Sequence, residues 1–231
     1  MVERLLTRSR FRARSVLGTV DALEALREPL AHTAADVYVA SLELIRELVG
    51  FRFHRGVLAL GERSESASVS VADTARTVVA LEDVRDPENV GGVFRNAQAF
   101  AVGAVLLDAA SADPLGRKAI RVSAGAALSV PFARAGRWSA DLGRLNTAGF
   151  TLIALTPDPS APDIADVVVR DRVALVLGSE ESGLSAATRD AADTSARIPM
   201  ARGVDSLNVA VAAGIALYAL RAICSRREDS A

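Results

Sequence analysis

The sequence predicts an α/β protein whose main part is a doubly wound, mostly parallel sheet covered by helices. From residue 77 onward, apolar runs alternate with segments of helical spacing. Runs such as 173–177 (VALVL) are apolar at every position, which is typical of parallel strands buried on both faces. Polar or glycine-rich loops follow three of these runs. Ligands of such sheets bind at the carboxyl ends of the strands, so these loops are the first places to seek function.

The beginning of the chain is predicted to form a small α/β module over residues 1–63. A strand is expected at 37–40, a helix at 42–49 with Ser41 as its N-cap, and a second strand at 57–60. The polar, serine-rich stretch 61–73 (GERSESASVSVAD) is typical of a linker, which we place at residues 64–75.

The larger body is predicted over residues 76–224, with a polar tail at 225–231. Its strands are expected at 77–81, 104–107, 151–155, 174–177 and 196–198, and its helices at 90–100, 116–127, 139–148, 185–192 and 207–224. The last helix is apolar all round and is therefore expected to be buried. Its apolar stretch is well short of the roughly 20 residues that cross a bilayer.

Charge and cysteine content narrow the function. A net charge of −1 argues against a general nucleic-acid coat protein. Five arginines nevertheless crowd the first fourteen residues, and phosphate contacts or a merely solvated face explain them equally well. The single cysteine excludes an internal disulfide, and with two histidines we expect no metal centre. No hydrophobic run opens the sequence, so a cytoplasmic location is expected. The five arginines are Arg4, Arg8, Arg10, Arg12 and Arg14.

The first of the three loops is 86–97 (DPENVGGVFRNA). Asn89 is well suited to cap the helix that follows, which would put Gly91 and Gly92 in the first turn. Each glycine costs about 1 kcal/mol there relative to alanine, so a phosphate, a ligand or a partner helix is expected close to the backbone. Arg95 follows six residues after Asn89. A capped helix with an ordinary surface arginine is the simpler alternative.

The second loop, 177–185 (LGSEESGLS), places Glu180 and Glu181 at the exit of a buried strand. It has neither the serine spacing of a nucleophile elbow nor the Gly-Lys-Ser/Thr of a phosphate-binding loop. Its two carboxylates are suited to accept hydrogen bonds from a ribose, an amine or the backbone. A polar turn in which Ser185 caps the next helix is the simpler alternative.

The third loop, 198–212 (IPMARGVDSLNVAVA), places Ser206 and Asn208 at the mouth of the apolar helix. Polar groups there must be satisfied by the backbone or by a ligand. Helix capping explains Ser206 well and Asn208 less well.

In this order and spacing, N-x-G-x-x-x-R, L-G-S-E-x-x-G-L-S and I-P-M-x-x-x-x-x-S-L-N-V-A-V-A resemble the three signature motifs of the SpoU–TrmH family of RNA 2′-O-ribose methyltransferases. The resemblance covers roughly residues 78–220. It implies a deep trefoil knot in the C-terminal part of the sheet, and a homodimer with the active site close to the subunit interface. It also implies S-adenosylmethionine as cofactor and RNA as partner, with ribosomal RNA favoured.

The resemblance also assigns roles to residues. We expect Arg95 to hold the ribose hydroxyl and an adjacent phosphate, because arginine does not readily give up its proton, and we expect no metal to be required. The catalytic positions of the family fall on Asn89, Arg95, Glu180, Ser206 and Asn208. The cofactor is expected in the knot, held largely by backbone around Leu177, Gly178, Ile198, Met200, Ser206 and Leu207.

The N-terminal module looks like the small substrate-binding domain of the ribosomal-RNA members. That domain usually opens with a strand carrying a Glu-Gly pair ahead of the region matching residues 2–6, and this sequence starts after that point. Either its start is truncated or it recognises RNA differently. The alternatives are a transfer-RNA 2′-O-methyltransferase and a non-catalytic RNA-binding relative, which would lose polar motif residues. A dehydrogenase would want G-x-G-x-x-G after the first strand, and none is present.

Overall fold

The computed structural model describes residues 1–63, 68–169 and 171–228, with side chains up to residue 221. The chain divides into two compact units, an N-terminal unit, Met1–Glu65, and a C-terminal unit, Ser66–Ala231. None of the described helices combines the length and apolarity needed to span a bilayer.

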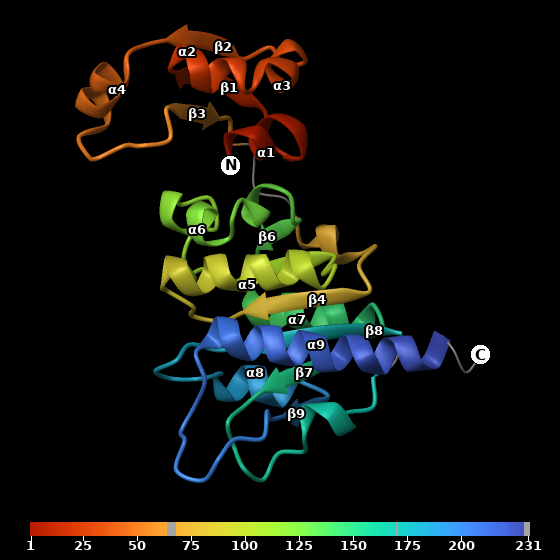
Figure 1. Cartoon of the computed structure of the whole chain (residues 1–231). Helices are drawn as coiled ribbons and strands as arrows, with labels where there is room; N and C mark the ends of the chain where they lie inside the picture. The colour runs from red at the N-terminus through yellow and green to blue at the C-terminus, as the bar shows by residue number, and fades with distance from the viewer. Residues whose placement is uncertain (64–67, 170, 229–231) are drawn as a thin grey trace. The chain divides into compact units, whose positions relative to one another are not determined.

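The N-terminal unit is a three-stranded sheet with short helices (Figure 1). In the strand order β2-β1-β3, the central strand is parallel to β2 and antiparallel to β3. Helix α4 begins behind Ser41, whose hydroxyl accepts from the Leu44 N–H at 3.2 Å, as predicted. The prediction missed the first four elements, because they are short and their apolar positions too few to show a period. The elements are α1 (Val2–Thr7), β1 (Ala13–Gly18), α2 (Val20–Glu24), α3 (Arg27–Ala31), β2 (Asp36–Val39), α4 (Leu42–Val49) and β3 (Val57–Gly61).

The C-terminal unit is built on a six-stranded sheet in which every paired strand is parallel, in the order β6-β5-β4-β8-β7-β9. The chain first winds outward from β4 to β6 and then crosses to the other side of β4. The topological switch point therefore lies between β4 and β8, where Leu81 pairs with Leu177. The elements are η1 (Val69–Ala72), β4 (Thr77–Leu81), α5 (Pro87–Ala99), β5 (Ala104–Leu107), α6 (Arg117–Val122), η2 (Ala126–Leu128), β6 (Phe132–Arg134), α7 (Trp138–Thr147), β7 (Phe150–Leu155), η3 (Ile164–Asp166), β8 (Arg172–Leu177), α8 (Ala186–Ala191), β9 (Thr194–Ala196) and α9 (Val209–Glu228).

Both faces of this sheet are buried, as the continuous apolar runs predicted. Along β8, Leu175 and Leu177 pack into one apolar cluster with α5 and α9, whereas Ala174 and Val176 pack into a second cluster with α7. Successive side chains of a strand point to opposite faces, so both clusters need every position of the run to be apolar. Figure 1 shows α5 and α9 lying side by side on one face.

Several predicted boundaries are wrong. The linker does not reach residue 75, because Val69, Ala72 and Ala75 are buried in the core of the C-terminal unit. The helix predicted at 116–127 is broken into α6 and η2, because Ala124 and Gly125 adopt positive φ angles of 51° and 85°. Strand β6 was not predicted, and α9 continues through Glu228 into the predicted polar tail.

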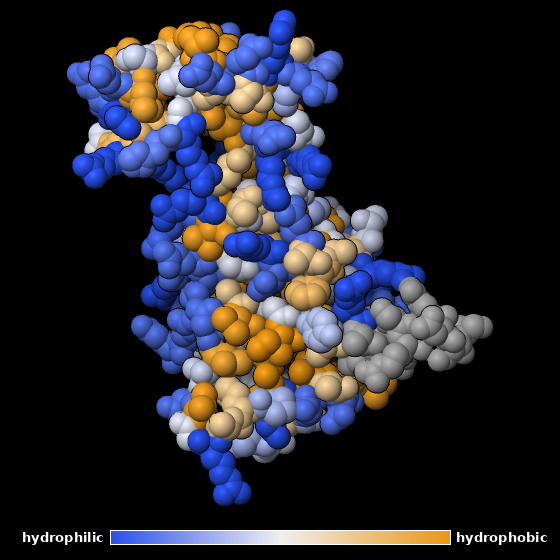
Figure 2. Space-filling model, in the orientation of Figure 1, coloured by the Kyte–Doolittle hydropathy of each residue, from blue (hydrophilic) through white to orange (hydrophobic). Residues whose placement is uncertain are grey.

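Helix α9 is also not buried all round. Its inner face, which includes Ala213 and Leu217, is fully covered. On its outer face Val211, Ile215 and Tyr218 are 50%, 41% and 66% exposed, and Figure 2 shows hydrophobic surface gathered over this helix. An apolar helix is therefore left with one face to the solvent.

Candidate active site

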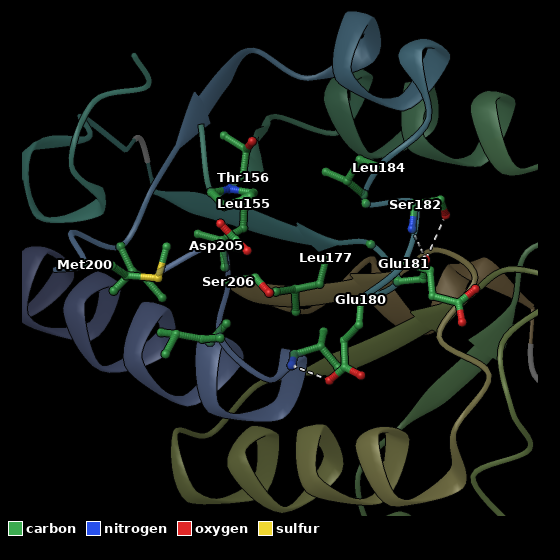
Figure 3. Close-up of a pocket in the computed structure, with 18 of the residues that line it drawn as sticks. Leu155, Thr156, Leu177, Glu180, Glu181, Ser182, Leu184, Met200, Asp205 and Ser206 are labelled. Carbon is green, nitrogen blue, oxygen red and sulfur yellow. Dashed lines mark hydrogen bonds between the residues drawn. The ribbon is translucent and has the colours of Figure 1, made fainter. Parts of the chain in front are cut away.

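A cavity of about 430 Å³ opens at the carboxyl ends of β7, β8 and β9 (Figure 3). Its walls come from the loops that follow these strands and from the first turns of α9. The volume is within the usual range for a small-molecule site. All six predicted cofactor positions line it: Leu177, Gly178, Ile198, Met200, Ser206 and Leu207.

The loop after β8 has its shape because two glycines touch. A Cβ on Gly178 would lie 2.3 Å from the carbonyl carbon of Gly183, so no side chain fits there. Gly183 itself has a φ of 64° and donates its N–H to the Ser179 carbonyl at 3.0 Å. The glycines of the L-G-S-E-x-x-G motif are thus required by backbone packing, and the tight loop projects its side chains along the cavity wall.

Three predicted polar residues meet at the start of α9. The Asn208 side-chain amide donates to Asn89 Oδ1 at 2.7 Å and to Glu180 Oε1 at 2.9 Å. Glu180 also accepts from the Val209 N–H at 3.3 Å and lines the cavity. Residues from three distant segments of the chain therefore form one hydrogen-bonded cluster at the edge of the cavity, and Asn89, in the first turn of α5, is buried.

Two predicted helix caps are wrong. Asp86, not Asn89, caps α5, accepting from the Glu88 N–H at 2.8 Å, and Pro87 fills the first helical position. At the start of α9 the cap is Asn208 rather than Ser206. Asn208 Oδ1 accepts hydrogen bonds from the N–H groups of Ala210 and Val211, at 3.0 and 3.2 Å. Ser206 is exposed and lines the cavity instead.

The two glycines of the first motif allow helices to approach closely. A Cβ on Gly91 would lie 2.7 Å from the Ala119 carbonyl oxygen of α6, and one on Gly92 would lie 2.6 Å from the Ala210 Cβ of α9. Asn96 strengthens the second contact by donating to the Ala210 carbonyl at 2.6 Å. Of the three causes considered from the sequence, partner helices are therefore the one observed, and they bring Asn89 to Asn208.

Arg95 is the predicted residue that the structure does not bring to the cluster. It lies on the same face of α5 as Gly91 and Gln98, which are four residues before it and three residues after it. Gly91 packs against α6, and Gln98 donates a hydrogen bond to Ser129 at the end of η2. The Arg95 side chain is exposed and does not line the cavity. It forms no hydrogen bond or ion pair with any residue that the structure describes, so its guanidinium is available to a ligand.

Glu82 is a residue that the sequence reasoning missed. Its carboxylate accepts from the Ser185 N–H at 3.0 Å, from the Ser185 hydroxyl at 2.8 Å and from the Thr188 hydroxyl at 2.8 Å. The indole of Trp138 donates to the same Thr188 oxygen at 2.9 Å. Glu82 thus ties the cavity-lining loop to the end of β4. Its position immediately after a predicted buried strand was the signal that could have found it.

We predict that Glu82→Gln lowers the free energy of unfolding by about 1–2 kcal/mol and weakens cofactor binding. An amide offers one acceptor oxygen in place of two and turns its own donors toward the serine and threonine groups. Chemical denaturation and calorimetric titration measure the two effects. The matched control is Glu88→Gln, which removes a half-exposed ion pair with Lys118 and should change stability by less than about 1 kcal/mol. Equal losses in both variants would contradict the role of Glu82.

The cavity combines apolar walls with acidic groups. Leucine, isoleucine, methionine and valine side chains line one part, and Glu180, Glu181 and Asp205 line another. Of the described residues that line the cavity, Arg189 is the one cation, and it donates to the Leu184 carbonyl. Among the described residues, no three potential metal-binding side chains come together. The lining therefore suits an organic molecule that has an apolar part and a positive charge.

The last residue of β7, Leu155, and the loop residues Thr156 and Pro157 also line the cavity and were not predicted as part of the site. Just beyond it, hydrogen bonds from the Ser160 N–H and hydroxyl lower the pKa of Asp158 and hold the turn. The loop follows a predicted strand, but it carries no charged residue beside the cavity to draw attention to it.

Known proteins resemble this chain along most of its length. Residues 76–218 match the model of the SpoU rRNA Methylase family. An uncharacterized tRNA/rRNA methyltransferase of Mycobacterium tuberculosis is 45% identical, over 94% of this chain and 77% of that protein. A 23S rRNA (guanosine-2′-O-)-methyltransferase of Acinetobacter baylyi is 34% identical, over 94% and 88%.

The AdoMet-bound rRNA methyltransferase of Sinorhizobium meliloti superposes with a TM-score of 0.79 at 26% identity, covering 92% of this chain and 81% of that one. Structural similarity of this extent confirms the predicted fold class, a doubly wound parallel sheet with a C-terminal trefoil knot.

Proposed function

This chain belongs to the SpoU rRNA methylase family, and from that premise we propose that it transfers a methyl group from S-adenosylmethionine to a ribose 2′-hydroxyl of ribosomal RNA. The observation that carries the proposal is the convergence of three loops. The six cofactor positions line one cavity, and the cluster of Asn89, Glu180 and Asn208 lies at its edge. The similarity to the 23S rRNA enzyme extends over both units, which favours ribosomal over transfer RNA.

The residues present fit the cofactor. Gly178 and Gly183 carry no side chains, so the loop presents backbone at the cavity wall, where its peptide groups could hydrogen-bond to the adenine of the cofactor. Leu177, Ile198 and Leu207 offer the apolar surface that such a ring needs. The carboxylates of Glu180 and Asp205 balance a positive charge. When bound, S-adenosylmethionine supplies a methyl group activated by the positive sulfonium.

The chain's own residues must then present the ribose. We assign to Asn89 and Asn208 the positioning of the sugar, with Glu180 fixing the Asn208 amide by accepting its hydrogen bond. Positioning of this kind supplies at best roughly 7–11 kcal/mol of the barrier. We assign to Arg95 the stabilisation of negative charge on the ribose oxygen and the grip on an adjacent phosphate, and the phosphate or a water takes the proton. Ser206 lines the cavity, and we assign to it the same role of positioning the ribose.

A methylation assay tests this function. The purified protein should transfer labelled methyl from S-adenosylmethionine to a 23S rRNA transcript, and the labelled linkage should resist alkali, because a methylated 2′-oxygen no longer attacks the neighbouring phosphate. Transfer RNA should accept little label. An alkali-sensitive linkage, or label in transfer RNA alone, would overturn the proposal.

We further propose a homodimer that covers the outer face of α9. Val211, Ile215 and Tyr218 expose a continuous apolar stripe, and exposed patches of this kind usually mark a protein interface. The stripe adjoins α5, since the rings of Phe100 and Tyr218 lie 6.4 Å apart. A partner on this face would therefore lie beside the helix that carries Arg95. The cytoplasmic location expected from the sequence stays a prediction.

We predict that Tyr218→Glu converts the dimer to a monomer, because a charge on the stripe must be desolvated for the subunits to associate. Sedimentation equilibrium measures the change, and the dissociation constant should rise at least a hundredfold. Val20→Glu, at a position 68% exposed in the N-terminal unit, is the control and should leave association unchanged. A Tyr218→Glu protein that sediments like the wild type would exclude this interface.

A further inference from the structure

The arginine-rich start of the chain has a regular pattern of exposure. From Arg8 to Ser15 every even-numbered residue is an exposed arginine, and every odd-numbered residue is a half-buried serine, phenylalanine or alanine. Only the end of this segment is a strand, because β1 begins at Ala13 and the chain bends at Arg8, Arg10 and Phe11 before it. All four arginine side chains of this segment are nevertheless exposed to solvent. We call Arg8, Arg10, Arg12 and Arg14 the arginine row.

A β-bulge sets the last member of the row. The register between β1 and β3 shifts between Ala13 and Ser15, so Arg14 has no partner residue on β3. Bulges re-aim a side chain, and here the bulge separates the exposed Arg14 from the buried Val16 two residues later. The row therefore ends at Arg14, because the next even-numbered residues of β1, Val16 and Gly18, are buried.

The positive charge of the row is not balanced by ion pairs. None of the four guanidinium groups forms an ion pair with any residue in the described ranges 1–63, 68–169 and 171–228. One acid, Glu62, follows the end of β3, and its backbone N–H donates to the Arg12 carbonyl at 2.8 Å. Four like charges held along so short a segment repel one another, and the repulsion is relieved when a polyanion binds.

We propose that the arginine row binds the phosphate backbone of the RNA substrate. This inference rests on the proposed function and deepens it, because it names the part of the N-terminal unit that contacts RNA. Four exposed guanidinium groups within seven residues form a dense patch of positive charge, which is the electrostatic footprint of a nucleic-acid-binding surface. Arginine forks match phosphate oxygens with two parallel hydrogen bonds. The contacts carry no base information, so the row supplies affinity and register.

Salt titration of RNA binding tests the proposal. For the full-length protein and an RNA transcript that it methylates, the logarithm of the binding constant falls with the logarithm of the salt concentration by about 0.7 per phosphate contact on single strands. The triple variant Arg10→Ala/Arg12→Ala/Arg14→Ala should reduce this slope by about 2. The same three positions changed to lysine should keep most of the slope, because the charges remain.

Arg27→Ala is the matched control in the same unit. Arg27 is also exposed but is paired with Glu24 at 3.4 Å, so its removal should leave the slope unchanged. Cofactor binding should be the same in all variants. A triple alanine variant with the wild-type slope would overturn the proposal and direct the search to a protein or membrane partner for the row. A wild-type protein that methylates no RNA would instead overturn the proposed function, so the two failures are distinguishable.

Discussion

Arg95→Ala should lower the rate of methyl transfer by two to three orders of magnitude while leaving the affinity for S-adenosylmethionine within twofold of wild type. The side chain is exposed, does not line the cavity and bonds to no described residue, so its loss disturbs neither the fold nor cofactor binding. What is lost is a donor to the charge that develops on the ribose oxygen, and removing one such donor typically costs about 10²–10³ in rate. Single-turnover kinetics and calorimetric titration measure the two quantities.

The control for this prediction is Arg121→Ala, which removes another exposed arginine from the neighbouring helix α6 and should retain near wild-type rates. An Arg95→Ala enzyme of ordinary activity would show that the guanidinium takes no part in the reaction. Mixed dimers of Arg95→Ala subunits and inactive Glu180→Ala subunits show whether Arg95 acts at the cavity of its own subunit or at that of the partner. If it serves the partner's cavity, random mixed dimers recover about a quarter of wild-type activity, whereas a role in its own subunit recovers none.

Gly178→Ala should weaken cofactor binding more than tenfold, which corresponds to about 1.4 kcal/mol. The added methyl carbon would lie 2.3–2.5 Å from Gly183 and Leu184 backbone atoms, and backbone on a tight loop has no rotamer by which to move aside. The loop must open, and it carries Glu180 and the cavity wall with it. Calorimetric titration with S-adenosylmethionine measures the effect, and thermal unfolding reports the accompanying strain.

Gly143→Ala is a sharp control because it adds the same methyl group where no atom lies within 4 Å. Gly143 is inside α7, so alanine there should raise stability by roughly 0.5–1 kcal/mol and leave cofactor binding unchanged. If Gly178→Ala bound the cofactor as tightly as the wild type, the close contact between Gly178 and Gly183 would have no role in shaping the cavity.

Local patterns in the sequence predicted the elements whose cause is local. Strands β4 and β5 and helix α4 were placed at their observed residues, because apolar runs and a serine cap act within a few residues. The residues expected to hold the cofactor were chosen through motif order and spacing, and all six line one cavity. Motifs that end strands of one parallel sheet must meet at the same edge, so their order along the chain is informative about their position in space.

The tertiary structure alone decided which of several possible partners each polar residue has. Asn89 was expected to cap a helix, yet it accepts a hydrogen bond from Asn208. For Gly92 the sequence left a phosphate, a ligand or a partner helix open, and the structure shows that Ala210 of α9 packs against it. Glu82 was not predicted as a site residue, yet its carboxylate accepts hydrogen bonds from Ser185 and Thr188, which follow β8. In each case the partner lies about a hundred residues away in the chain. Capping and periodicity describe neighbours in sequence, whereas packing across the sheet brings together residues whose proximity no local pattern records.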